Sequence, residues 1–264
     1  MLHFGLIGEH LGHSLSVPIH QAIYARLGLE ADYRLIEIPR EELTTRVTAL
    51  FQEKLDGFNI TIPYKQDIIP MLTQLDHAAS CIGAVNTVDC AEKIGHNTDA
   101  PGFAAMLHHH GMNVQGKPCY VLGTGGASKA VVAALRDEGA SSVTLVSRTA
   151  KDGVITYDQL AEEFSGYLIN CTPAGMWPHV DGCPVSDDAL SALLPRALGV
   201  ADVIYNPPET RLTLAAKAAN VPSCTGLYML VAQAVVAESI WLKRDLPSNL
   251  TELVMHDIEE QKLL

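Results

Sequence analysis

The sequence predicts an α/β protein of two domains, and three features of the chain carry that prediction. Short apolar runs alternate with helical patterns along most of the 264 residues, as expected for helices packed on a mostly parallel sheet. A glycine-rich turn follows a buried strand near the middle of the chain, which is typical of a Rossmann-type domain. The tail returns to a helical apolar pattern. We therefore expect an N-terminal α/β domain over 1–99, completed by C-terminal helices in 227–264, and a Rossmann-type domain over 100–226.

The first 100 residues predict strands separated by helices. The strands are expected over 3–7, 32–38, 55–60, 84–89 and 93–96, and the helices over 18–27, 40–54 and 63–75. Pro18 suits the first turn of its helix and Gly28 suits a helix stop. Pro63 has the same role for a helix that would carry Lys65.

The second domain is expected to begin after a helical stretch over 99–110. Its predicted elements are a strand at 119–122, a helix at 127–138, a strand at 142–146 and an extended run at 154–156. That last run follows the previous strand too closely for a crossover helix, which needs roughly a dozen residues or more. It is therefore an edge piece or an irregular link. The apolar positions after Gly226 predict a helix, which we expect to pack back on the first domain.

Composition and charge exclude several classes of protein. The formal net charge is −12, which disfavours a nucleic-acid partner because phosphates need a basic face. No stretch is long and apolar enough to span a membrane, and the start of the chain lacks a secretion signal. The six cysteines form no C-x-x-C pair and no zinc-like group with histidine. We expect a cytoplasmic monomer or homodimer that binds a small-molecule substrate, with no metal, nucleic-acid or membrane partner.

A dinucleotide site is predicted at the glycine-rich loop. The loop follows a strand and opens a helix, and its residues are Gly123, Thr124, Gly125, Gly126, Ala127 and Ser128. Glycine permits the tight turn and the close approach of backbone to a pyrophosphate, while the helix N-terminus supplies N–H donors. Ser128 stands where the usual pattern has a third Gly or Ala, so a purely structural turn is the alternative.

The end of the next strand favours NADP over NAD. An NAD site usually carries an acidic residue there to hold the ribose hydroxyls, whereas this chain has Ser147, Arg148 and Thr149, with Lys151 close behind. A cation and two hydroxyls suit a 2′-phosphate. The alternative is a solvated loop arginine, and the nearby Asp152 would weaken phosphate binding if it pointed inward. NAD therefore stays possible.

Polar residues gather at strand ends in the first domain, where open α/β sheets bind ligands. They are Ser14, Ser16, Asn59, Thr61, Lys65, Asn86, Thr87, Asn97, Thr98 and Asp99. Hydroxyls and amides of this kind suit a small polyol acid, since each can donate or accept. Lys65 and Asp99 near one substrate hydroxyl would form a proton relay for alcohol oxidation coupled to hydride transfer. The alternative is a lysine at a helix start and an aspartate at a helix N-cap.

Several ordered motifs resemble the shikimate dehydrogenase family. The opening motif is Gly5-Leu6-Ile7-Gly8 with His13-Ser14-Leu15-Ser16 and Pro18-Ile19-His20, and the catalytic-lysine motif is Asn59-Ile60-Thr61-Ile62-Pro63-Tyr64-Lys65. The later motifs are Gly83-Ala84-Val85-Asn86-Thr87, Asn97-Thr98-Asp99, Tyr205-Asn206-Pro207 with Thr210, and Gly226 with Met229-Leu230 and Gln233. The resemblance runs nearly end to end.

The resemblance implies reversible NADPH-linked reduction of 3-dehydroshikimate to shikimate in aromatic amino-acid biosynthesis, with Lys65 as acid–base residue beside Asp99. It also implies substrate contacts, at Ser14 and Ser16 for the carboxylate and at Asn59, Thr61, Asn86, Tyr205 and Gln233. The implied cofactor contacts are the loop 123–127, Ser147, Arg148, Thr149 and Lys151, with Val203 and Gly226 near the nicotinamide. Alternatives are a quinate/shikimate dehydrogenase that prefers NAD, or a silent nucleotide-binding regulator. The regulator predicts loss of Lys65 or Asp99, and both are present.

The chain departs from the family pattern beside the cofactor site. Ser147 replaces the usual Asn before Arg-Thr, and the helix expected after this motif is missing. Tyr228 stands where the family commonly has Gly, which could narrow the nicotinamide side of the site. The run His108-His109-His110 is interpreted as a polar helix end, because consecutive helical residues point in different directions and do not ligate one ion. Cys171 is interpreted as pocket lining, not as a nucleophile.

Overall fold

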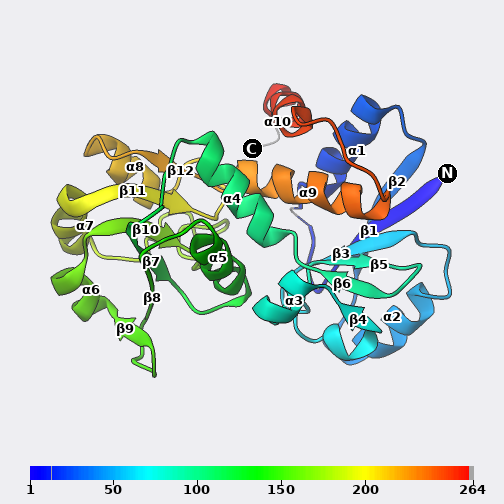
Figure 1. Ribbon diagram of the computed structural model, residues 1–264, viewed down its shortest axis with the longest axis horizontal. Helices are drawn as coiled ribbons and strands as arrows, with labels where there is room; N and C mark the ends of the chain where they lie inside the picture. The colour runs from blue at the N-terminus through cyan, green and yellow to red at the C-terminus, as the bar shows by residue number, and fades with distance from the viewer. Residues whose placement is uncertain (13, 262–264) are drawn as a thin grey trace. The chain divides into compact units, whose positions relative to one another are not determined.

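The computed structural model describes residues 1–12 and 14–261, and its chain forms two compact units (Figure 1). One unit comprises Met1–Asp99 together with the chain from Val231 onward, and the other comprises Ala100–Leu230. Each unit is built on its own sheet. The helix that crosses from the second unit back to the first is α9 (Leu227–Trp241).

The first unit contains a mixed sheet in the order β2-β1-β3-β5-β6-β4. Its strands are β1 (Leu2–Gly8), β2 (Ala31–Glu37), β3 (Gly57–Ile60), β4 (Gln74–Leu75), β5 (Thr87–Asp89) and β6 (Ile94–His96). Its helices include α1 (Ser16–Leu27), α2 (Leu43–Leu50), α3 (His77–Ile82) and α10 (Leu250–Glu260). The β1 strand is parallel to both β2 and β3, whereas β5 is antiparallel to both of its neighbours. The mostly parallel α/β architecture is confirmed.

The C-terminal helices pack on this sheet and on α1, as predicted. The indole Nε1 of Trp241 in α9 donates to the carbonyl of Val88 over 2.9 Å. A Cβ on Gly57 would lie 2.2 Å from that indole nitrogen, so only glycine leaves room for the ring. The α1 and α10 helices pack together, and Arg26 forms two hydrogen bonds to the carboxylate of Asp257. The apolar side chains of α9, such as Trp241 and Ala237, pack with Phe4 and Tyr24, and burying these side chains stabilises the fold.

The predicted helix over 63–75 is wrong. The segment forms consecutive turns followed by a short 3-10 helix at Ile69–Met71, and β4 follows. Pro70 explains the difference, because proline in a helix interior removes a donor and clashes with the preceding turn. Lys65 therefore lies in a turn that is held by short-range bonds such as Tyr64 N to the Thr61 carbonyl.

Two further helices of the first unit differ from the prediction. The helix expected over 40–54 is a 3-10 turn at Arg40–Glu42 followed by α2, and it ends at Leu50. The α3 helix was not predicted, although its signals are in the sequence. Asp76 caps it by accepting from the Ala79 N–H over 2.6 Å, and Gly83 ends it with a φ of 67°.

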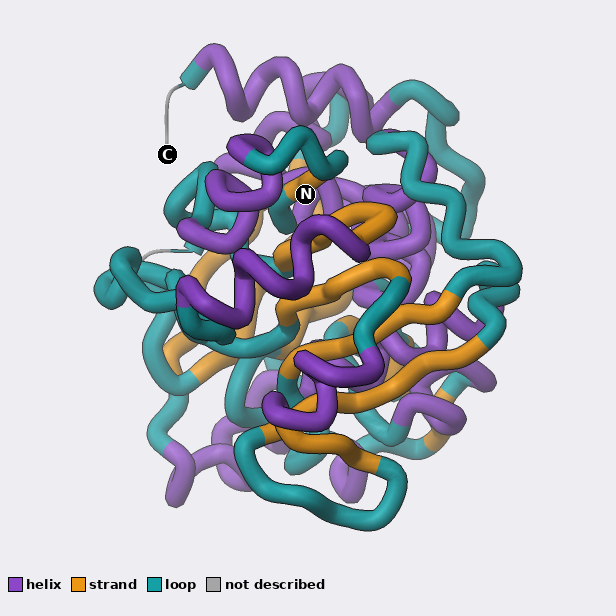
Figure 2. The backbone as a smooth tube through the Cα atoms, turned by 90° about the vertical axis from the view of Figure 1, so that its left-hand side faces the viewer, coloured by secondary structure: helices purple, strands orange, loops and turns teal. Residues whose placement is uncertain are grey.

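The second unit contains a fully parallel sheet in the order β12-β11-β10-β7-β8-β9. Its strands are β7 (Pro118–Leu122), β8 (Ser142–Ser147), β9 (Val154–Thr156), β10 (Gly166–Asn170), β11 (Ala197–Asp202) and β12 (Ser223–Cys224). Its helices include α4 (Asp99–His109, whose first residue belongs to the first unit), α5 (Gly126–Asp137), α6 (Tyr157–Glu163), α7 (Asp187–Leu193) and α8 (Arg211–Ala218). Figure 2 turns this unit toward the viewer and shows its strands flanked by helices.

The extended run after Arg148 is an edge strand. β9 pairs parallel with the second half of β8, from Leu145 opposite Val154, and the described residues between the two strands form no helix. The helix that follows, α6, starts with a capping box in which Thr156 and Gln159 satisfy each other's backbone N–H groups. The loop from β8 into β9 is thus short and lies at the edge of the sheet.

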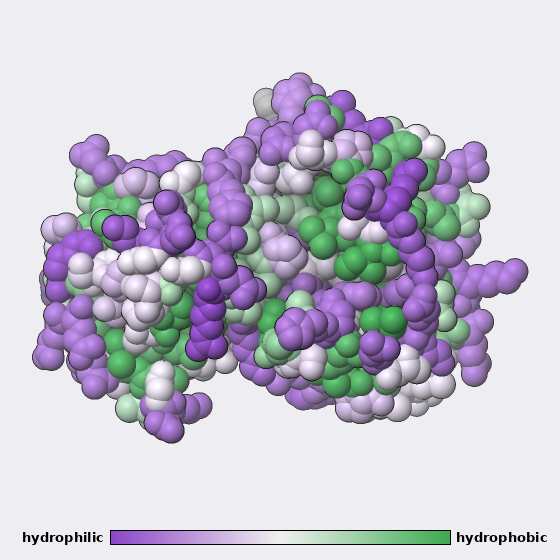
Figure 3. Space-filling model, in the orientation of Figure 1, coloured by the Kyte–Doolittle hydropathy of each residue, from purple (hydrophilic) through white to green (hydrophobic). Residues whose placement is uncertain are grey.

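The surface follows the pattern of an ordinary folded protein. Figure 3 shows hydrophilic residues over much of the visible face, with hydrophobic residues in smaller patches between them. Of the large exposed apolar side chains, Leu35, Leu198 and Leu214 lie on separate elements, whereas Met176 and Trp177 are neighbours in one loop. Among the described residues, no helix has the length and apolar character that crossing a bilayer requires.

Candidate active site

Lys65 and Asp99 form an ion pair at the carboxyl edge of the first sheet. The Nζ of Lys65 lies 2.5 Å from Oδ2 of Asp99, and the two side chains are 16% and 10% exposed. Lys65 is held through its carbonyl, which accepts from the Val85 N–H. Asp99 is the first residue of α4, and its backbone N–H donates to the side-chain oxygen of Asn97. A short, partly buried pair of this kind is charge-assisted and keeps a proton donor close to solvent.

Asn86 fixes the other oxygen of Asp99. Its Nδ2 donates to Asp99 Oδ1 over 2.9 Å, and it also lies 2.9 Å from Thr98 Oγ1 and 3.3 Å from Gln233 Oε1. Both carboxylate oxygens of Asp99 are therefore held, one by Lys65 and one by Asn86. Gln233 reaches this cluster from α9, and so a residue far away in the sequence completes it.

Asn59 belongs to the same buried network and is 5% exposed. Its Oδ1 accepts from the Tyr33 hydroxyl over 2.7 Å, and its Nδ2 donates to the Asn86 carbonyl and to Thr87 Oγ1. Every polar atom of this amide is thus occupied by the protein itself. Thr61, two residues on, is partly exposed at the start of the turn that carries Lys65.

Ser14 and Ser16 lie at the N-terminus of α1. The Ser14 hydroxyl is 3.1 Å from the Ser16 hydroxyl and also accepts from the Ser16 backbone N–H. The side chain of the N-cap residue, Leu15, offers no acceptor to the first turn, so the N-terminal donors of α1 are suited to an anion. His13, which belongs to the same sequence motif, lies outside the described residues.

The glycine-rich loop of the second unit has the backbone that a pyrophosphate needs. Gly123 has a φ of 100°, and a Cβ there would lie 3.0 Å from the methyl group of Thr172. Gly125 is the N-cap of α5 and has no side chain over the helix end. The loop residues Thr124 and Ala127 continue this turn into α5. Ser128 stands where Gly or Ala is expected, and its hydroxyl donates back to the Gly125 carbonyl over 2.7 Å in the buried first turn of the helix.

Arg148 is exposed at the end of β8. The flanking residues form a tight turn, in which Ser147 Oγ donates to the Thr149 carbonyl and accepts from the Thr149 N–H. Within the described part of the chain, Arg148 has no carboxylate partner. Lys151 is exposed and pairs through its backbone with Val154. The guanidinium is thus available to an anionic ligand.

Gly226 permits a close approach between two loops of the second unit. A Cβ at Gly226 would lie 2.1 Å from the carbonyl oxygen of Val203, and the Gly226 N–H donates to the Ile204 carbonyl. Tyr205 follows in the same loop and is half-buried. It belongs to the second unit, whereas the predicted substrate contacts Ser14, Ser16, Asn59, Thr61, Asn86 and Gln233 lie in the first.

A buried aspartate that the sequence reasoning missed anchors this loop. Asp202 Oδ1 accepts from Asn170 Nδ2 and from the Ile204 N–H, and its Oδ2 accepts from the Thr210 hydroxyl over 2.8 Å. Burial raises the pKa of Asp202 to about 6, although these three hydrogen bonds oppose the shift. An aspartate at a strand end before Tyr205 was the only signal of it in the sequence.

Tyr33 was also missed. It lies in β2, where a tyrosine at a buried strand position is most simply read as core. Only the fold shows that its hydroxyl reaches Asn59. No sequence pattern could have found this contact, because it joins two strands that lie on either side of β1.

The histidine run and Cys171 take structural roles. His108 bonds Glu138 over 2.6 Å, and the His109 ring stacks on Tyr228 with centroids 4.0 Å apart. Tyr228 is therefore packed against α4, within the same unit. Burial raises the pKa of the Cys171 thiol well above its usual range, which suppresses the nucleophilic thiolate.

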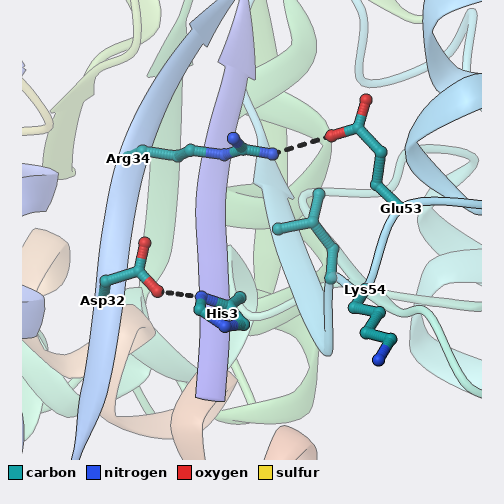
Figure 4. Close-up of a pocket in the computed structure, with 6 residues that line it drawn as sticks. His3, Asp32, Arg34, Glu53 and Lys54 are labelled. Carbon is teal, nitrogen blue, oxygen red and sulfur yellow. Dashed lines mark hydrogen bonds and ion pairs between the residues drawn. The ribbon is translucent and has the colours of Figure 1, made fainter. Parts of the chain in front are cut away.

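A surface pocket lies at the opposite edge of the first sheet from Lys65, near the starts of β1 and β2 (Figure 4). Four of its charged groups are paired with each other, since His3 contacts Asp32 and Arg34 donates to Glu53 over 2.9 Å, and Lys54 is the fifth charged residue of the lining. Mutual pairing leaves little charge for a ligand.

The chain is similar to known proteins over nearly its whole length. Residues 6–88 match the family model described as the shikimate dehydrogenase substrate binding domain. The chain is 39% identical over 260 residues to the shikimate dehydrogenase (NADP(+)) of Clostridium beijerinckii, with 94% of this chain and 95% of that protein covered.

Solved structures give the same result. A chorismate mutase/shikimate 5-dehydrogenase fusion protein from Clostridium acetobutylicum has a TM-score of 0.93 at 35% identity, covering 99% of this chain and 98% of that chain. The shikimate 5-dehydrogenase from Thermus thermophilus, in complex with NADP(H) and shikimate, scores 0.85 at 31% identity, covering 97% and 99%. The quinate dehydrogenase from Corynebacterium glutamicum, in complex with NAD, scores 0.83 at 28%, covering 97% and 99%. Identity of this level over almost the full length, together with the ordered site residues, shows that the chain belongs to the shikimate dehydrogenase family.

Proposed function

We propose that the protein catalyses the reversible NADPH-linked reduction of 3-dehydroshikimate to shikimate, a step of aromatic amino-acid biosynthesis. The observation that carries the proposal is the 2.5 Å pair of Lys65 and Asp99, held by Asn86 in a cluster that Gln233 completes. The similarity to proteins named shikimate dehydrogenase (NADP(+)) supports the same reaction. Both residues that a silent regulator would be expected to lose are present.

In the reduction, the Lys65 ammonium donates a proton to the ketone oxygen as negative charge develops there. NADPH supplies the hydride when it is bound. Asp99 keeps the ammonium aimed at the reacting oxygen and accepts a hydrogen bond from the product hydroxyl. In the oxidation, Lys65 as the free amine accepts the hydroxyl proton. Its partial exposure of 16% lets it exchange that proton with solvent.

The remaining polar residues would bind the substrate. Ser14 and Ser16 would hold the carboxylate at the N-terminus of α1, where backbone donors favour an anion. Asn86 and Gln233 would bind ring hydroxyls next to the reacting carbon. We assign Asn59 to the support of Asn86, because its Nδ2 donates to the Asn86 carbonyl. Thr61 and Tyr205 would line the pocket as further donors.

The second unit would bind NADP, and its residues fit that cofactor. The open backbone from Gly123 through Ala127 suits the pyrophosphate, and Val203 with Gly226 would lie near the nicotinamide. Arg148, with Ser147 and Thr149 beside it, would take the 2′-phosphate, and Lys151 would add positive charge. A guanidinium with no acidic partner among the described residues favours NADP over NAD. In this proposal, residues 1–99 with the C-terminal helices form the substrate domain, and residues 100–226 form the cofactor domain.

The alternative is a quinate/shikimate dehydrogenase that prefers NAD, which the similarity to a quinate dehydrogenase in complex with NAD favours. Initial rates for shikimate and quinate, each with NADP and with NAD, separate the two activities when reduced nicotinamide is followed. We expect shikimate with NADP to give the highest kcat/KM. Higher kcat/KM with quinate and NAD would favour the alternative, and no turnover in all four combinations would contradict the enzyme. We further propose that the protein is a cytoplasmic monomer or homodimer. Sedimentation of the purified protein would measure its oligomeric state.

A further inference from the structure

A histidine and a glutamate form a fully buried pair that the proposed reaction does not use. His20 of α1 and Glu238 of α9 are both 0% exposed, and Nδ1 of the histidine lies 2.6 Å from Oε1 of the glutamate. Removing such groups from water is costly unless they are well paired. A pair kept at this cost in the core of the first unit suggests a role for the ring that it holds.

The pair holds the His20 ring flat against Tyr33. The two ring centroids are 3.8 Å apart and the ring planes differ by 9°, while Tyr33 itself is 5% exposed. The hydrogen bond to Glu238 fixes the rotation of the imidazole about its Cβ. The fixed imidazole in turn holds the ring of Tyr33, which stacks on it. Burial raises the pKa of Tyr33 well above its usual range, and the charge of Glu238 adds to this. Tyr33 therefore stays a neutral phenol that can donate.

The Tyr33 hydroxyl lies between two groups of the proposed substrate site. It donates to Asn59 Oδ1 over 2.7 Å, and the Ser16 side chain is near enough to lower the pKa of the phenol. Ser16 belongs to the proposed carboxylate site, and Asn59 supports Asn86. One phenol thus connects the carboxylate end with the reacting end.

The donor from Tyr33 also decides which way the Asn59 amide points. An amide oxygen and an amide nitrogen have the same shape, so their placement depends on the partners. Because Oδ1 faces the phenol, Nδ2 faces the Asn86 carbonyl at 3.2 Å and Thr87 Oγ1 at 2.9 Å. A flipped amide would face the Asn86 carbonyl with its oxygen. Asn86 in turn holds Asp99, the partner of Lys65.

We propose that Tyr33, held in place by the His20–Glu238 pair, is a positioning residue of this enzyme that orients the Asn59 amide, which supports Asn86, and keeps the Ser16 hydroxyl in its substrate-binding arrangement. The inference rests on the proposed function, because its readout is turnover of shikimate. It concerns residues that touch neither substrate nor cofactor and act through Asn59 and Ser16.

The first test is Tyr33→Phe, which keeps the stacked ring and removes only the hydroxyl. We expect kcat/KM for shikimate to fall on the order of tenfold or more, as for loss of a buried hydrogen bond whose acceptor stays buried. The KM for NADP should not change. Tyr167→Phe is the matched control: it also removes one hydrogen-bonded tyrosine hydroxyl, which donates to the Asn113 carbonyl within the second unit, and its kcat/KM should remain near the wild-type value.

The second test asks whether the pair acts through the tyrosine. Glu238→Gln keeps an oxygen that can accept from His20 but removes the charge, and we expect kcat/KM for shikimate to fall about threefold to tenfold. Combined with Tyr33→Phe, it should lower kcat/KM no further than Tyr33→Phe does alone, because residues that act in series are not additive. Additive losses, or loss of NADP binding in equal measure, would overturn the inference.

Folding is monitored by thermal unfolding of each variant. If Tyr33→Phe does not fold, Glu238→Gln decides: a folded variant with wild-type kcat/KM for shikimate overturns the role of the pair. An active wild-type enzyme with an equally active Tyr33→Phe variant overturns this inference alone. A wild-type protein that is inactive with every substrate and cofactor overturns the proposed function instead.

Discussion

The amine of Lys65 and the carboxylate of Asp99 lie 2.5 Å apart, although the two residues are 34 positions apart in the sequence and neither lies in the interior of a helix or strand. Lys65 comes from a turn after β3, and Asp99 is the first residue of α4. Asn86 holds the far oxygen of the carboxylate, so the pair has a fixed geometry. A fixed lysine that is partly open to solvent is suited to proton transfer.

Replacement of Lys65 by alanine should lower kcat for shikimate oxidation by roughly 10²–10⁴, the usual contribution of a positioned acid–base group. KM for shikimate should change little, since the contact matters most in the transition state. Steady-state kinetics of Lys65→Ala measure both. Lys54→Ala, which removes an exposed lysine at the opposite edge of the same sheet, serves as the control. A rise in KM at unchanged kcat would make Lys65 a binding residue.

Replacement of Arg148 by alanine should weaken NADP far more than NAD. A charge-assisted bond to a phosphate contributes roughly 1.5–3 kcal/mol, which corresponds to about a tenfold to hundredfold rise in KM for NADP. KM for each cofactor at saturating shikimate is the measurement. Arg136→Ala, an exposed arginine at the end of α5, should leave both values unchanged. Equal effects on NADP and NAD would remove Arg148 from phosphate recognition.

The buried Asp202 should make the protein less stable as the pH rises through the acid range. Burial raises its pKa from 3.8 to about 6 in the folded state, so between these values the folded protein binds more protons than the unfolded chain. The free energy of unfolding should therefore lose about 3 kcal/mol between roughly pH 4 and pH 7 from this group. Urea unfolding at several pH values would show that loss in the wild type and not in Asp202→Asn. Parallel pH curves of the two proteins would show that Asp202 keeps an ordinary pKa.

Replacement of Gly226 by alanine should destabilise the protein by roughly 1–3 kcal/mol, the usual cost of overpacking. The new Cβ would lie 2.1 Å from the Val203 carbonyl, and backbone on both sides cannot move aside cheaply. The free energy of unfolding without cofactor is the measurement. Gly126→Ala is the control, because a Cβ there meets no described atom within 4 Å. Similar stabilities for the two variants would indicate that the Val203 loop yields easily.

The helices that are specified by hydrophobic periodicity and by proline or glycine at their ends were predicted well. The helix from the Pro18 region to Gly28 and the helix after the glycine-rich loop occur as expected, since their end signals are local. The helix predicted around Lys65 does not form, because distant contacts decide the conformation of this segment. Its apolar pattern suited a helix, but Pro70 limits the segment to turns, and its residues are held by contacts with other strands.

In the candidate site, too, some features were predicted from the sequence and others are visible only in the structure. Lys65, Asp99 and Asn86 were predicted from motifs, and the structure brings them together with Gln233. Asn59 was predicted as a substrate contact, and that role stays a prediction; in the structure its amide bonds Tyr33, the Asn86 carbonyl and Thr87. Motif position identifies which side chains matter, whereas only the packed neighbours decide which of their atoms stay free.

By itself, the sequence determined the α/β class, the glycine-rich loop, the cation at the end of β8 and the residue types of the site. Those properties depend on local periodicity, on glycine and proline, and on the chemistry of single side chains. The tertiary structure alone decided that Lys65 meets Asp99, that the Tyr33 hydroxyl bonds the Asn59 amide, and that Glu238 pairs with His20 across 218 positions of the chain. Such contacts depend on which strands become neighbours and on how α9 packs against the first sheet. Chain packing fixes both, and no local pattern encodes them.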